Sequence, residues 1–155
     1  MYGCQTACVR SNSIRQAPVA PAVDPNADPY NVGYSRAQLE AVGIYGNPLD
    51  IKTVYFEYNS SAIDAKSTVV ITSHARHLGK MGGANVGLDG HADERGTRDY
   101  NLALGERRAQ SVGQLMTAEG ARSAMQIVSY GEEQPVDAGH NEAAWQQNRR
   151  VEIKY

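Results

Sequence analysis

Apolar positions recur along the second half of the chain with the periods of strands and helices. Apolar alternation over residues 54–58 predicts a strand. Asp64 is a good helix N-cap, and the apolar positions that follow it repeat with a helical period to about Met81, where Gly82 and Gly83 end the helix. By the same criteria, strands are predicted at residues 85–90, 126–130 and 150–155, and a second long helix from about Arg98 to Glu119.

The order of these elements, β-α-β-α-β-β, predicts a two-layer α+β fold over residues 51–155. Strand-helix-strand units cross over with a right hand, so both helices are expected to cover one face of a mixed sheet. Residues 131–148, between the last two strands, are predicted to be a loop. A single domain of this kind needs on the order of 100 residues.

Residues 1–50 are predicted to be a flexible, extended tail. Ala, Pro, Asp and Asn dominate residues 16–30, a composition that favours extended conformations and offers little surface to bury. One short helix is expected within the tail, with Ser35 as its N-cap and Gly43 just past its end.

The second long helix carries a charged residue on its apolar side. Arg108 lies one turn after Leu104 in this stripe, whereas Arg107 lies on the polar side. An uncompensated buried charge costs several kcal/mol, so the guanidinium must reach solvent or meet an anion. Asp93 or a bound carboxylate could be that anion. At 100° per residue the apolar stripe comprises Leu102, Leu104, Ala109, Val112, Leu115 and Met116.

The first long helix carries a histidine, His74, on its buried side. A single histidine in such a place is more often a core residue with satisfied hydrogen bonds than a ligand, and we expect the former. The predicted apolar stripe of this helix comprises Ser67, Val70, Ile71, Ala75, Leu78 and Met81.

Composition narrows the classes of function. A formal charge of −2 and a pI near 6.1 give no electrostatic basis for binding nucleic acid. No apolar run reaches the roughly 18 residues of a membrane-spanning helix. Cys4 and Cys8 both precede any plausible core and cannot cross-link the fold. No secretory signal is recognisable, but Gly3-Cys4 is similar to the end of a bacterial lipoprotein signal.

The competing hypothesis is an enzyme. A zinc hydrolase site could be assembled from His91, Asp93 and Glu94 with another histidine. The sequence contains neither the HExxH spacing of zinc peptidases nor the G-x-S-x-G motif of serine hydrolases. We therefore expect no catalysis, no metal and no cofactor.

The stretch GHADERGTRDYNLALGERRA, residues 90–109, resembles the OmpA-like peptidoglycan-binding domain. Within that family it resembles the peptidoglycan-associated lipoproteins (Pal). VYFEYNSSAI near the first strand, IVSYGEEQP at the third and NEAAWQQNRRVEI before the last support the resemblance. It covers residues 53–155 in order and without large gaps.

The resemblance implies binding of the peptide stem of peptidoglycan at the side-chain end of meso-diaminopimelate. That end carries an ammonium and a carboxylate on one carbon. Asp93 matches the position that takes the ammonium, and Arg108 matches the position that takes the carboxylate as a bidentate pair. The family usually has aspartate where Asn59 stands, and an amide brings no negative charge. The other pocket positions implied are Tyr58, Asn59, Glu94, Arg95, Thr97, Asn101 and Leu104.

The resemblance also implies where the protein works. Cys4 would be acylated, which would anchor the chain in the outer membrane of a Gram-negative bacterium, and residues 5–50 would be the tether to a periplasmic domain. In the Tol-Pal system, which serves envelope integrity and cell division, such a domain also meets the periplasmic protein TolB. The alternative within the fold is the wall-binding domain of another OmpA-type protein or of a flagellar stator. Arg149 and Arg150 are predicted to be structural, tying the last strand to the loop around Trp145.

Overall fold

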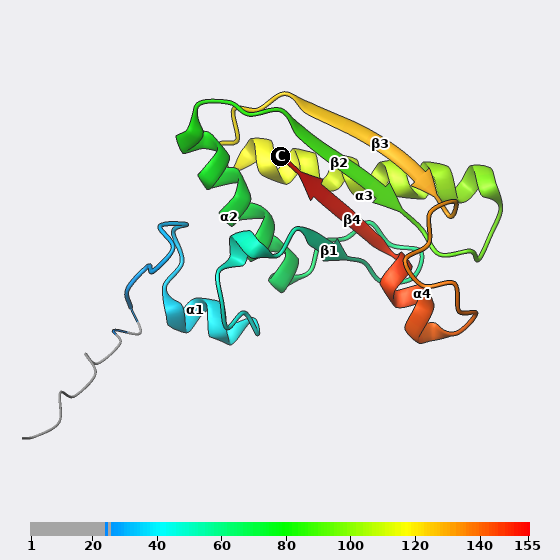
Figure 1. Cartoon of the computed structure of the whole chain (residues 1–155), viewed down its shortest axis with the longest axis horizontal. Coiled ribbons are helices and arrows are strands. Elements are labelled where there is room, and N and C mark those ends of the chain that lie inside the picture. The colour runs from blue at the N-terminus through cyan, green and yellow to red at the C-terminus, as the bar shows by residue number, and fades with distance from the viewer. Residues whose placement is uncertain (1–23, 25) are drawn as a thin grey trace, which may run out of the picture.

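The computed structural model describes residues 24 and 26–155. Four strands form one mixed sheet in the order β1-β4-β2-β3, in which β4 is antiparallel to β1 and β2, and β2 is parallel to β3. Helices α2 and α3 cover one face of it (Figure 1), as predicted. The elements are α1 (Arg36–Ala41), η1 (Pro48–Asp50), β1 (Thr53–Tyr55), α2 (Ala65–Met81), β2 (Val86–His91), α3 (Arg98–Ala118), β3 (Met125–Gly131), α4 (Glu142–Asn148) and β4 (Arg150–Lys154).

The core lies between the sheet and these two helices. Val54, Leu88 and Ile153 on the strands and Ile71 and Val112 on the helices are at most 2% exposed. Both long helices begin where the sequence predicts. The carboxylate of Asp64 accepts from Ser67 N at 2.6 Å, and the hydroxyl of Thr97 accepts from Tyr100 N at 3.2 Å.

Direct contact between backbones sets the position of α3 on the sheet. A Cβ on Gly90 of β2 would lie 1.9 Å from the carbonyl oxygen of Gly105 in α3, and a Cβ on Gly105 would lie 2.5 Å from Ser129 Oγ of β3. Only glycine allows so close an approach. Because Arg108 comes less than one turn after Gly105, this contact brings it to the end of β2.

The structure corrects three details of the predicted elements. The first strand ends at Tyr55 rather than at residue 58, and Tyr58 is 58% exposed. The stretch predicted as a loop contains α4, a helix of seven residues, which is too short for a helical period to stand out in the sequence. Leu102 and Met81 are 43% and 59% exposed, because the contact face of α3 is centred on its glycines and α2 ends at Met81.

The predicted tail also differs from the structure, because residues 27–50 fold onto the domain. Leu39 and Ile44 belong to the hydrophobic core, so this segment has apolar surface to bury after all. Ser35 caps α1 as expected. Lys80 Nζ of α2 donates to the carbonyl oxygen of Asn31 at 2.5 Å, which ties the start of the segment to α2. Residues 1–23 and 25, including Cys4 and Cys8, lie outside the described residues.

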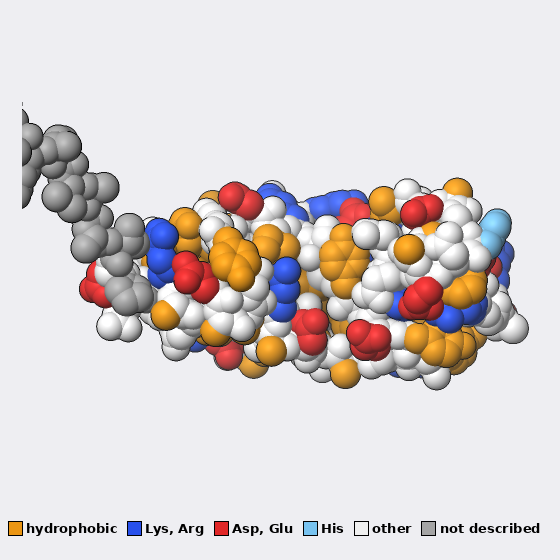
Figure 2. Space-filling model, turned by 90° about the horizontal axis from the view of Figure 1, so that it is seen from below, with side chains coloured by type: hydrophobic (Ala, Val, Ile, Leu, Met, Phe, Trp, Pro, Cys, Tyr) orange, Lys and Arg blue, Asp and Glu red, His pale blue; other side chains and the backbone are white. Residues whose placement is uncertain are grey.

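The surface carries both signs of charge. On the face shown in Figure 2, acidic and basic side chains are interspersed with apolar ones, and neither sign dominates. Among residues 24 and 26–155, no helix combines the length and the apolar character needed to cross a membrane.

Candidate functional site

Arg108 is fully buried at 0% exposure, and three backbone carbonyls hold its guanidinium. Nε donates to Ser60 O at 2.8 Å, Nη1 to His91 O at 2.9 Å and Nη2 to Glu57 O at 3.0 Å. A guanidinium has five N–H donors, so each terminal nitrogen keeps one N–H without a partner among the described residues. Burial lowers the pKa of Arg108 to about 10, and the negative charge of Asp93 opposes this change. The side chain therefore stays cationic at neutral pH.

Asp93 lies in the turn between β2 and α3 and is 4% exposed. Its Oδ1 accepts from Arg95 N at 3.1 Å, and its Oδ2 accepts from Arg95 Nη2 at 2.7 Å and from Arg149 Nη1 at 3.3 Å. Burial alone would raise the pKa of Asp93, but the hydrogen bonds from Arg95 and Arg149 outweigh it and leave the pKa below its ordinary value. The direct salt-bridge partners of Asp93 are Arg95 and Arg149, whereas the sequence had offered Arg108.

Asp93 and Arg108 line the same cleft, whose volume is about 210 Å³. The segment after β1, the turn after β2 and the first turns of α3 enclose it. Two oppositely charged groups thus face one small space, which suits a ligand that carries both charges. The lining residues are Tyr58, Asn59, Asp93, Arg95, Gly96, Tyr100, Leu104 and Arg108.

Aromatic contacts hold the rim of the cleft. The guanidinium of Arg95 lies between two rings, 4.0 Å from the centroid of Tyr58 and 4.2 Å from that of Trp145. Asn59 adopts a left-handed conformation (φ 50°), which asparagine tolerates better than most residues, and its Oδ1 accepts from the hydroxyl of Tyr100. This bond joins the segment after β1 to α3 across the cleft.

Sequence reasoning missed Tyr100, although a signal for it was present. Tyr100, Leu104 and Arg108 follow one another at intervals of four residues and so lie in one row along α3. All three line the cleft. Once Arg108 is identified, the same row two turns earlier identifies Tyr100.

Three residues expected at the pocket lie outside the cleft. Glu94 accepts from Trp145 Nε1 at 2.9 Å and pairs with His140 Nδ1 at 2.6 Å, and it lines a neighbouring cleft of about 310 Å³. The hydrogen bond from His140 is the main cause that lowers the pKa of Glu94. Thr97 is the N-cap of α3, and Asn101 is buried and donates to Glu132.

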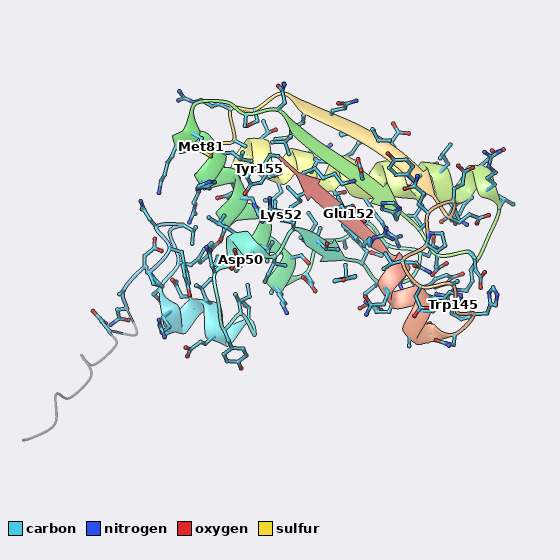
Figure 3. All side chains as sticks on the ribbon, viewed as in Figure 1. Asp50, Lys52, Met81, Trp145, Glu152 and Tyr155 are labelled. Carbon is cyan, nitrogen blue, oxygen red and sulfur yellow. The ribbon has the colours of Figure 1, made fainter. Side chains whose placement is uncertain are left out.

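Arg149 joins α4 to the cleft. It is 1% exposed, and its Nε donates to Phe56 O at 3.0 Å while its Nη2 donates to Glu142 Oε1 at 2.7 Å. The predicted structural role near Trp145 is thus observed, and the same guanidinium also holds Asp93. Figure 3 shows Trp145 on α4, at the other end of the molecule from Met81.

No group of three histidine, cysteine, aspartate or glutamate side chains in the described part of the chain is arranged to hold a metal ion. His74, the buried histidine of α2, has partners for both ring nitrogens. Nδ1 lies 2.7 Å from the Tyr155 hydroxyl and Nε2 lies 2.8 Å from Ile51 O. The expectation of a core histidine with satisfied hydrogen bonds is confirmed.

Comparison with known proteins identifies the family of the chain. The OmpA family model matches residues 55–149. The peptidoglycan-associated lipoprotein of Pseudomonas aeruginosa is 44% identical over 136 residues, which cover 85% of this chain and 77% of the relative. The protein of the same name from Haemophilus influenzae is 38% identical over 124 residues, covering 79% and 76%.

Solved structures agree with these sequence relatives. The crystal structure of the peptidoglycan-associated lipoprotein from Burkholderia pseudomallei superposes with a TM-score of 0.68 at 36% identity, covering 76% of this chain and 98% of that one. The C-terminal domain of Helicobacter pylori MotB, at 23% identity, TM-score 0.61 and coverage of 67% and 83%, shares the fold. The chain therefore belongs to the OmpA family and, within it, to the peptidoglycan-associated lipoproteins.

Proposed function

We propose that the cleft binds the side-chain end of meso-diaminopimelate in the peptide stem of peptidoglycan, noncovalently and without catalysis. The ligand carboxylate takes the two remaining N–H groups of Arg108, and the ligand ammonium lies against Asp93. The observation that carries the proposal is a buried guanidinium with unspent donors beside a buried carboxylate, both lining one cleft.

The contacts around both charged groups support binding by a preorganised site. Three carbonyls already hold Arg108, so little side-chain freedom is lost when a carboxylate binds. Each carboxylate oxygen offers about two lone pairs, and Oδ1 of Asp93 accepts one hydrogen bond from Arg95 N, which leaves it room for an ammonium donor. The cleft is small, so it suits one amino-acid end rather than a sugar chain.

We further propose that the protein tethers the outer membrane to the cell wall, with Cys4 acylated and the domain in the periplasm. The names of its relatives support association with peptidoglycan and a lipid anchor. The described chain starts at the opposite end of the molecule from α4 (Figure 1), and Arg149, at the end of α4, contacts Asp93 of the cleft. This arrangement suits the bridging of two layers. Work within the Tol-Pal system, and binding of TolB at the same surface, are parts of this proposal.

A pair of ligands that differ in one group tests the site. Stem tripeptides ending in meso-diaminopimelate or in lysine both carry the ammonium, but lysine lacks the carboxylate. We expect calorimetry to show about 10- to 100-fold tighter binding of the diaminopimelate peptide, since hydrogen bonds to charged groups contribute roughly 1.5–3 kcal/mol. Arg108→Lys should remove this preference, because an ammonium cannot make the planar two-point contact.

Arg107→Lys is the matched control, because the same change falls on the exposed neighbour and should leave the preference intact. Circular dichroism of Arg108→Lys separates lost recognition from lost folding. A folded Arg108→Lys protein that still prefers diaminopimelate would overturn the assignment of the carboxylate. Equal binding of the two peptides by the wild type would overturn the proposed ligand.

A further inference from the structure

The edge of the sheet at β3 presents backbone hydrogen-bonding groups that the described chain does not use. β3 is the longest strand, with seven residues, and its one strand neighbour among the described residues is β2. The other edge strand, β1, has three residues. Long edges are usually protected by charged residues or proline, but β3 (MQIVSYG) contains neither.

The pairing with β2 determines which groups face outward. Val86 N donates to Ala124 O at 2.9 Å, so residues 124, 126 and 128 direct their backbone groups toward β2. In a ladder alternate residues point the other way, which leaves the N–H and C=O groups of Met125, Ile127 and Ser129 on the outer edge.

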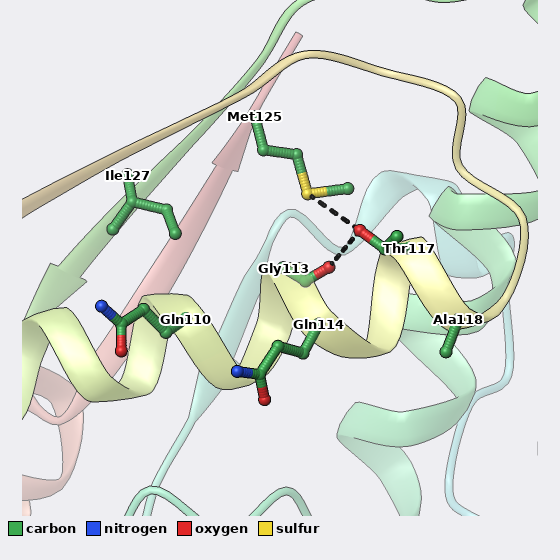
Figure 4. Close-up of a pocket in the computed structure, with 7 residues that line it drawn as sticks. All are labelled: Gln110, Gly113, Gln114, Thr117, Ala118, Met125 and Ile127. Carbon is green, nitrogen blue, oxygen red and sulfur yellow. Dashed lines mark hydrogen bonds between the residues drawn. The ribbon is translucent and has the colours of Figure 1, made fainter.

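A hollow of about 560 Å³ lies beside this edge, between β3 and the second half of α3 (Figure 4). Met125 and Ile127 line it from the strand, and Ile127 is 38% exposed. None of the lining side chains is charged, so the hollow favours an uncharged occupant. Those contributed by α3 are Gln110, Gly113, Gln114, Thr117 and Ala118.

We propose that β3 pairs antiparallel with β3 of a second copy of this chain. A two-fold axis through Ile127 sets Ile127 opposite its equivalent and Met125 opposite Ser129. All three outward residues of each copy then form hydrogen-bonded pairs in one register. A second copy fits because the strand is uncharged and so meets no like charge, and because both exposed edges are satisfied at once. The inference does not depend on what the cleft binds.

The dimer joins the two sheets into one and carries two clefts. Two binding sites on one particle raise the apparent affinity for a polymer with repeated stems, because the second site binds as an intramolecular event. This consequence for a polymeric ligand rests on the proposed function, whereas the pairing itself does not.

Sedimentation equilibrium of the full chain, with reductant present so that Cys4 and Cys8 form no links, tests the proposal. The wild type is expected to dimerise reversibly. Ile127→Lys is expected to raise the dimer dissociation constant about 10-fold, since it removes an apolar pair and sets two ammonium groups opposite each other across the axis. The matched control Val136→Lys, at a residue that is 63% exposed and outside β3, should leave it unchanged.

Hydrogen exchange on the wild type tests the register without a mutation. The amides of Met125, Ile127 and Ser129 should gain protection as protein concentration rises, whereas those of Gln126 and Val128, which face β2, should not. A chain that stays monomeric to millimolar concentration overturns the proposal, as does a dimer indifferent to Ile127→Lys. Protection of the edge amides that appears only when a different protein is added assigns the edge to another strand and equally overturns it.

Discussion

His74 on α2 and Arg108 on α3 are both 0% exposed, yet their hydrogen-bonding groups are used to different extents. The two nitrogens of His74 meet Ile51 O and the Tyr155 hydroxyl. Because a carbonyl only accepts, Nε2 carries the proton and Nδ1 accepts from the tyrosine. Both ring nitrogens are therefore in use, and the ring offers a ligand no free donor or acceptor.

Arg108 uses three of its five N–H donors on backbone carbonyls, and it is one of the residues that line the cleft. The carbonyls fix the position of the guanidinium but leave two of its N–H groups without an acceptor among the described residues. The comparison teaches that burial of a polar side chain by itself does not mark a binding site. What distinguishes Arg108 from His74 is remaining hydrogen-bonding capacity next to an accessible space.

Removal of Arg149 is expected to have the largest effect on stability, because this buried side chain holds Asp93 of the cleft in place. Arg149→Met would leave Asp93 with one cationic partner and Phe56 O without its donor. Breaking a buried charged pair costs about 3–5 kcal/mol, and we expect a fall of that size in the free energy of unfolding. Urea denaturation measures it. Arg107→Met is the exposed control, and a loss no larger than that control's would refute the role given to Arg149.

Acid should weaken the fold through a third buried side chain, His91, whose ring stacks on Tyr130. Burial, aided by Arg150, lowers its pKa from 6.5 to about 4, although Glu152 and Asp89 oppose the change. In the unfolded chain His91 therefore takes up a proton near pH 6.5, whereas in the folded chain it is protonated only near pH 4. The contribution of His91 to the free energy of unfolding is complete above pH 6.5, and it should fall by about 2–3 kcal/mol as the pH drops to 4.

Urea titrations between pH 7 and pH 4 would show this decline, and His91→Phe should flatten much of it. His74 adds a decline in the same direction, since burial lowers its pKa as well. A wild type and a His91→Phe variant with parallel pH profiles would contradict the assignment to His91.

Tyr155→Phe removes the hydrogen bond between the Tyr155 hydroxyl and His74 Nδ1. The loss of an ordinary hydrogen bond should cost about 1 kcal/mol of stability and leave ligand binding in the cleft unchanged. Tyr45→Phe, at a tyrosine that is 84% exposed, controls for the hydroxyl itself. Thermal denaturation checks the loss of stability, and calorimetry checks that ligand binding is unchanged. Altered binding in Tyr155→Phe would show that the surroundings of His74 are coupled to the cleft.

Asn59→Asp should have the smallest effect, and it adds a negative charge to the cleft. The carboxylate can still accept from Tyr100, and aspartate tolerates the left-handed conformation of residue 59. Binding of a ligand ammonium should tighten by about 2- to 5-fold at low salt, as expected for an exposed charge pair, and the gain should fade as salt rises. Calorimetry at two salt concentrations measures it, and a gain that survives high salt would argue against an electrostatic origin.

Local patterns in the sequence determined most of the fold. The N-cap Asp64 and the glycines after α2 set the limits of that helix, and the pattern of apolar residues identified the strands of the sheet, because these signals act over a few residues. Helical periodicity alone also placed Arg108 on a buried face, and the structure confirms that burial.

Tertiary structure decided what surrounds Arg108. Its carbonyl partners at Glu57, Ser60 and His91 lie 51, 48 and 17 residues away, and backbone carbonyls are identical at every position. No pattern of side chains can therefore identify them. Arg149 as the partner of Asp93, 56 residues away, and the packing of residues 27–50 could not be predicted either, because local patterns do not show which distant segments meet in the fold. Sequence could show that a charge is buried, but only the folded backbone could show which groups compensate it and which donors it keeps.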